Sequence, residues 1–264
     1  MKLKRYVKLY LKMAAMCIKT KMTYRADFII SSIGILVTSV LEVMTIFILL
    51  QSIDTFKGWS YYEMVFMYSF SLLTLMPTAV FFDNFWNLNT YIKEGTFIKH
   101  YFRPLDVMFS FTSEVVEIKG LTQGIFGIGL LIWSMIKMNY VFSLCNIICM
   151  LVIFVFSSGI MISFLIMSAS TSFWIVNSDS VMTLATKFKD YAKYPMTIYS
   201  KFLRFIFTYI LPVGFISFYP SDFFLHQNSF DKSILLLPFI SSLFFFISYK
   251  VFMLGAAHYS GTGS

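Results

Sequence analysis

The chain has 264 residues, of which 58% are hydrophobic and 20% aromatic, and its formal net charge is +8. A soluble domain of this length has no way to bury so much apolar surface, whereas a lipid bilayer accepts apolar side chains directly. The composition therefore excludes an ordinary soluble enzyme and predicts an all-α, multi-pass membrane protein. Contact with anionic lipid explains the basic charge without a nucleic-acid partner. No linker or low-complexity tract divides residues 1–264, which indicates a single domain.

Residues 1–26 are predicted to form an amphipathic helix ahead of the first membrane span. Val7, Leu11 and Ile18 recur on one side at helical spacing, and basic residues such as Lys8 lie mostly on the other. A helix of this kind lies in the membrane interface, where its lysines extend toward the head groups. Two interpretations are open: an interfacial element with a role of its own, or a basic anchor that only fixes the orientation.

Six apolar stretches are long enough to cross the membrane, because a crossing needs roughly 20 apolar residues. The predicted spans are 28–50, 62–82, 115–136, 141–168, 202–219 and 234–254. Pro77 interrupts the second span and Pro212 the fifth, and each proline is expected to kink or unwind its helix.

The basic residues orient these six spans. Eighteen of the twenty-one lysines and arginines fall on one side, and only Lys57, Lys137 and Lys232 fall on the other. Cytoplasmic loops of membrane proteins carry an excess of lysine and arginine, so both termini are predicted to be cytoplasmic. The same topology places the connections 83–105 and 171–201 in the cytoplasm, the second as an amphipathic segment.

Three carboxylates are candidates to line a translocation path. Glu42 lies deep in the first span, where a charge costs about 3 kcal/mol, so it marks either a path or a protonated or partnered glutamate at a helix interface. Glu114 and Glu117 are one turn apart at the predicted start of the third span. Gly120 and Gly124 follow as a Gly-x-x-x-Gly pair, which allows close helix packing. The alternative for Glu114 and Glu117 is a place in interfacial water.

Several chemistries are missing from the sequence. The dipeptide Gly-Lys does not occur, so the chain has no phosphate-binding P-loop and cannot hydrolyse ATP by that route. His100, His226 and His258 are scattered, without the spacing of a metal site. Cys145 and Cys149 are interpreted as small apolar packing residues. We therefore expect no catalytic residue, no metal site and no cofactor bound by this chain.

Two inner segments carry the most specific motifs. Residues 91–105 read YIKEGTFIKHYFRPL, and residues 194–204 read YPMTIYSKFLR, with Pro212 and Pro220 after them. The C-terminal Tyr-Ser-Gly at 259–261 completes the pattern. In the order and spacing of these motifs the chain resembles, over nearly its whole length, the permease subunits of bacterial ABC exporters of the type-2 class.

The resemblance implies a six-span subunit of the bacterial cytoplasmic membrane that pairs, as a homodimer or heterodimer, with a second permease. Separate ATPase subunits, which hold ATP and Mg²⁺, would dock on the inner face and drive export, so the chain itself is not an enzyme. Segment 83–105 would be the coupling element, and the substrate path would form between the two permeases. The coupling candidates are Glu94, Gly95, Lys99, Arg103 and Pro104.

The chain departs from the family pattern at one pair of residues. Phe97 and Ile98 stand where the family pattern has a Leu-Asp pair. The charges of the coupling segment are also open to a simpler interpretation as solvated loop charges, because exposed ion pairs contribute little. The alternative function is a membrane scaffold, or a subunit of another membrane assembly without transport activity. Co-purification of an ATPase would separate the two functions.

Overall fold

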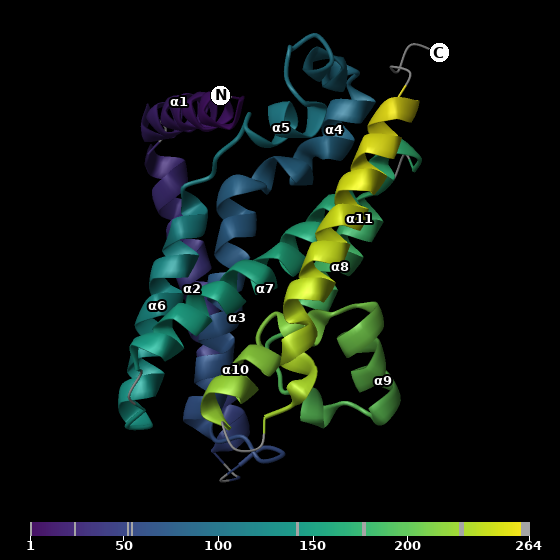
Figure 1. Ribbon diagram of the computed structural model, residues 1–264. Helices are drawn as coiled ribbons and strands as arrows, with labels where there is room; N and C mark the ends of the chain where they lie inside the picture. Colours follow the sequence, from purple (N-terminus) through teal and green to yellow (C-terminus); the bar gives the residue numbers. More distant parts are fainter. Residues whose placement is uncertain are drawn as a thin grey trace.

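The computed structural model of the chain is a bundle of helices (Figure 1), and it describes residues 2–23, 25–51, 53, 55–140, 143–175, 178–226 and 230–259. No strand occurs in these ranges, so the all-α prediction is confirmed. Within them, five helices are long and apolar enough to cross a membrane. They are α2 (Arg25–Leu50), α3 (Tyr61–Phe81), α6 (Lys119–Lys137), α7 (Leu144–Ser170) and α11 (Leu237–His258).

The shorter helices gather at the two ends of the bundle. Helix α1 (Lys2–Thr23) lies across one end, together with α4 (Leu88–Lys93), α5 (Val107–Thr112) and the last turns of α11 (Figure 1). We call this the α1 end. Helices α9 (Lys201–Phe205) and α10 (Phe218–Leu225) lie at the opposite end, which we call the α10 end (Figure 1).

Helix α3 is the buried centre of the bundle and packs closely on α6. The close approach depends on the predicted glycine stripe, because a Cβ added at Gly120 would lie 2.9 Å from the Cβ of Ala79. A Cβ at Gly124 would overlap the side chain of Met76. Pro77 does not end α3, which continues as one helix to Phe81. Small residues at the interface thus let the two backbones meet, as expected for helices in lipid.

The predicted fifth span, 202–219, is wrong as a single helix. The chain there forms α9, one π-helical turn (Ile206–Ile210), a 3₁₀ turn (Val213–Phe215) and then α10. Leu211 leaves the helical region with φ −120° and ψ 85°, immediately before Pro212. Proline lacks an amide hydrogen and disfavours helical geometry in the residue before it. Hydropathy registers the apolar residues of this stretch but not the break in helical hydrogen bonding.

Helix α8 (Asp179–Tyr191) lies in the connection 171–201, which was predicted to stay on the cytoplasmic side of the membrane. Its start is at the α1 end, where Asp179 lies 3.5 Å from Lys93, the last residue of α4. Arg204, in α9, pairs at 2.9 Å with Asp231 near the start of α11, at the α10 end. The segment 171–201, of which 176–177 are outside the described residues, therefore does not lie wholly at the α1 end. The lysines of this segment lower its mean hydropathy, so the sequence did not predict that the segment extends from one end of the bundle toward the other.

Candidate functional site

The predicted coupling segment, 83–105, folds as a cap on the α1 end of the bundle. A 3₁₀ turn (Asp83–Asn87) leads into α4, and a second 3₁₀ turn (Thr96–His100) follows. Gly95 connects these two elements with φ +72°, a left-handed conformation that glycine adopts without strain. Phe97 then anchors the turn, because its fully buried ring packs against aromatic side chains of three other elements. These are Phe111, Phe173 and Phe252.

Glu114 is the centre of a charged cluster beneath this cap. Its carboxylate accepts a hydrogen bond of 2.5 Å from the Lys99 amine and one of 3.2 Å from the Tyr91 hydroxyl. The Arg103 guanidinium lies 3.4 Å from the other carboxylate oxygen, and Nε2 of the buried His100 lies 3.6 Å from it. Four side chains of the cap thus converge on one carboxylate of the following segment. We call these five residues the Glu114 cluster.

The charge states of the cluster follow from burial and from the neighbouring cations. Burial raises the pKa of Glu114, but the hydrogen bond and charge of Lys99 outweigh this effect, so the pKa is lowered overall. Burial lowers the pKa of His100 to about 4, which leaves the imidazole neutral at pH 7. Burial and the nearby carboxylate raise the pKa of Tyr91 to about 12. At neutral pH one carboxylate therefore faces two fixed cations, the Tyr91 hydroxyl and a neutral imidazole.

A second set of contacts connects α1 to the start of α6. The Lys21 amine donates a hydrogen bond to the Glu117 carboxylate, and this bond raises the pKa of the lysine. The amine of Lys119 lies 3.8 Å from Glu117 and 3.9 Å from Asp83. Glu114 and Glu117 were predicted to lie at the start of the third span. In the structure both precede α6, which begins at Lys119. They tie α1 and the coupling cap to the same short stretch of chain.

Other side chains of the cap point away from the bundle. Phe102 is 80% exposed and Ile98 is 46% exposed, and Glu94 and Pro104 of the same segment are exposed as well. We call these four residues the exposed cap face. Exposed apolar side chains that gather in one short connection can mark a contact surface. Sequence reasoning singled out Glu94 and Pro104 but missed Phe102 and Ile98. Segment 83–105 contains many large apolar residues, and no local pattern separates these two from the buried Phe97.

The family model described as ABC-2 family transporter protein matches residues 36–263 of the chain. The protein belongs to the ABC-2 transporter family. An ABC-2 permease is the membrane component of a transporter and is not itself catalytic, and the family implies association with ABC ATPases. The family and the apolar helices together make this chain a multi-pass membrane protein. The resemblance seen in the sequence motifs is confirmed. A comparison with curated proteins gives no match.

Glu42 does not share its ion-pair partners with Glu114 and Glu117, the other two predicted path residues. Glu42, on α2, pairs at 2.6 Å with the Lys193 amine, which follows α8. Lys193 also lies 3.0 Å from Asp190. The partnered interpretation of Glu42 therefore describes the observed geometry. Sequence reasoning missed Lys193 as the partner, because 151 residues separate the two side chains and no local pattern connects them.

The five predicted coupling residues fall into three groups in the permease. Lys99 and Arg103 turn inward to Glu114, so they bind within the chain. Gly95 provides the turn. Glu94 and Pro104 remain at the surface. The inward-facing pair gives the cap an internal support, and the outward-facing residues are those available to a partner.

Proposed function

We propose that the protein is the transmembrane subunit of an ATP-driven exporter, and that its ATPase partners dock on the exposed cap face. The observation that carries the proposal is the exposure of Phe102 and Ile98 on a cap that the Glu114 cluster holds firmly. Apolar anchors on a rigid support are the usual centre of a stable protein contact. The partner ATPases would hold ATP and Mg²⁺, and this chain would bind neither.

The proposed topology places the α1 end in the cytoplasm of a bacterial cell. The start of α1 and the end of α11 lie at that end together (Figure 1), which supports two cytoplasmic termini. Helix α8, with the residues after it, would complete the sixth crossing in place of 202–219. Lys201 and Arg204 would then lie outside, and α1 would lie in the interface, with its exposed Val7 and Leu11 toward lipid.

The proposed mechanism follows the contacts of the cap. Closure of the ATPase domains around ATP would move the exposed cap face. The Glu114 cluster would carry this motion to the start of α6, and the bond between Glu117 and Lys21 would carry it to α1. The substrate path would lie between two permease copies or paralogues. Helix α2 supports this placement, because its apolar surface is widely exposed, with Ile30 at 70% and Ile48 at 66%.

The experiment is co-purification from native membranes, with mass spectrometry of everything that accompanies the tagged chain. We expect an ATPase with a phosphate loop and a permease partner. Phe102→Ala should lose the ATPase, because truncation of a central anchor costs about 2 kcal/mol or more. Phe202→Ala is the matched control, since Phe202 is 72% exposed but lies in α9 at the opposite end.

Two results would contradict the proposal. If Phe102→Ala keeps its ATPase while Phe202→Ala loses it, docking is not on the exposed cap face. If no ATPase accompanies the unmodified chain under conditions that keep it folded, the scaffold alternative gains support instead. The family itself does not favour that alternative.

A further inference from the structure

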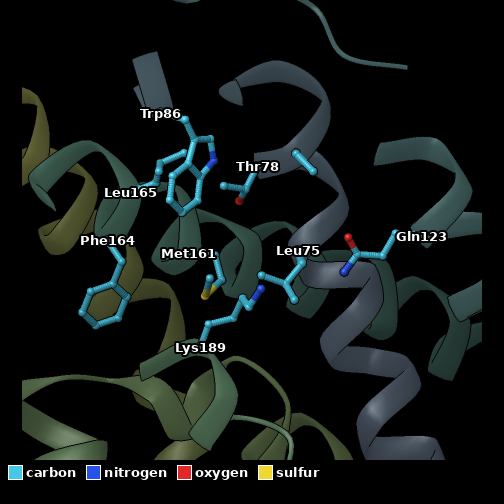
Figure 2. Close-up of a pocket in the computed structure, with 9 residues that line it drawn as sticks. Leu75, Thr78, Trp86, Gln123, Met161, Phe164, Leu165 and Lys189 are labelled. Atoms are coloured by element: carbon cyan, nitrogen blue, oxygen red, sulfur yellow. The ribbon is translucent and has the colours of Figure 1, made fainter. Parts of the chain in front are cut away.

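A cavity of about 110 Å³ lies between α3, α6, α7 and α8, away from the Glu114 cluster (Figure 2). Its walls are mostly apolar, with Trp86 of the first 3₁₀ turn on one side (Figure 2). Trp86 is 43% exposed, so this wall reaches the surface of the bundle. The apolar lining residues are Leu75, Ala79, Met161, Phe164 and Leu165.

The polar groups of the cavity are hydrogen-bond donors. Thr78, Gln123 and Lys189 line it, and no aspartate or glutamate is among the described lining residues (Figure 2). Figure 2 shows the Thr78 side chain directed toward Trp86, with Lys189 entering from below. A site that offers an amine, an amide and a hydroxyl without an acidic group favours an anion.

Two of these polar groups lack a partner among the residues that the structure describes. The Thr78 hydroxyl belongs to a residue only 7% exposed, and none of these residues hydrogen-bonds to it. A buried hydroxyl left unpaired is costly, so a ligand that pairs with it gains affinity. In the part of the chain that the structure describes, Lys189 forms no ion pair within 4.0 Å, and Glu42 and Asp190 pair with Lys193. The cavity therefore holds an amine that has no direct ion-pair partner among these residues.

We propose that this cavity binds the acidic head group of an amphiphile, a carboxylate or phosphate carried on an alkyl chain. The cavity has room for roughly four to six heavy atoms, judged against apolar cavities of similar volume that hold benzene. The acidic oxygens pair with Lys189 and Thr78, and the first methylenes contact Met161 and Leu165. The rest of the alkyl chain leaves past Trp86. The site belongs to one permease copy and does not require ATP-driven transport.

The test uses Trp86 as the reporter, with the full-length protein in nanodiscs of zwitterionic lipid. The probes are brominated stearate, a brominated phosphatidate and brominated stearyl alcohol, whose bromines quench tryptophan fluorescence at short range. The Trp86→Phe variant supplies the background from the other tryptophans. We expect saturable, Trp86-dependent quenching by one or both acids, and half-saturation by the alcohol at a concentration at least about tenfold higher. Comparison of stearate with phosphatidate identifies the source of the head group.

Variants of the two lysines on α8 locate the charge. Lys189→Met should remove the difference between acid and alcohol, and Lys189→Arg should keep it. Lys187→Met is the matched control, because the Lys187 side chain is exposed and lies outside the cavity lining. The proposal is overturned if acid and alcohol half-saturate at equal concentrations, if neither acid gives Trp86-dependent quenching, or if Lys189→Met keeps the preference for acid. The first two results come from the unmodified chain, so they stand even where a variant fails to fold.

Discussion

Replacement of Glu114 by glutamine tests whether the Glu114 cluster holds the coupling cap in place. The change keeps the size of the side chain but removes the charge that faces Lys99 at 2.5 Å and Arg103 at 3.4 Å. A hydrogen bond to a charged group contributes about 1.5–3 kcal/mol. The side chains of Lys99 and Arg103 are 40% and 37% exposed, so water replaces part of each contact. We therefore expect a loss of about 1–3 kcal/mol from the local stability of the cap.

Hydrogen exchange measures this loss where it occurs. A decrease of that size in the opening free energy corresponds to amide exchange about 5- to 150-fold faster in residues 96–103. Exchange in α7 should change much less, because that helix packs in the bundle. Glu94→Gln is the matched control, since Glu94 is an exposed carboxylate of the same cap. The same exchange profile for Glu114→Gln and Glu94→Gln would refute the supporting role of the cluster.

Three further predictions use other features of the fold. Because burial lowers the pKa of His100 from 6.5 to about 4, stability should be full above pH 6.5 and fall between pH 6.5 and 4. The total loss is about 3 kcal/mol, and His100→Asn should flatten the pH dependence of thermal unfolding. Gly120→Ala should destabilise the protein by about 1–3 kcal/mol, whereas Gly129→Ala, with nothing within 4 Å of its added Cβ, should not. A single cysteine at Lys201 should react with an impermeant thiol reagent in intact cells, and one at Glu94 should not; the reverse would invert the proposed topology.

Five of the six predicted spans correspond to long helices, because continuous apolar stretches have few alternatives in a bilayer. The exception, 202–219, is equally apolar but contains Pro212, and the route of the backbone there depends on hydrogen bonding that composition does not report. The reverse error concerns α8. Three lysines, Lys187, Lys189 and Lys193, made it look like a cytoplasmic segment, although Lys193 pairs with Glu42 inside the bundle.

The sequence predicted which residues belong to the candidate site, but it did not predict which of them contact one another. Lys99, Arg103 and Glu114 were all singled out, but the first two were assigned to a partner chain and the third to a substrate path. The structure brings them together because the left-handed turn at Gly95 directs the cap back toward Glu114. That folding-back depends on the burial of Phe97, a position where the family pattern predicted leucine. Contacts between segments that share no sequence periodicity cannot be predicted until the tertiary fold is known.

The pairing of Glu42 with Lys193 also constrains how the protein is made. Lys193 is synthesised 151 residues after Glu42, which at roughly 5–20 residues per second is an interval of about 8–30 s. Throughout that interval α2 holds an acidic group in the membrane without its cation, at a cost of about 2.5–3.5 kcal/mol if ionised at the bilayer centre. Newly inserted α2 is therefore metastable until α8 arrives. A chain that stops before Lys193 keeps Glu42 without this cation.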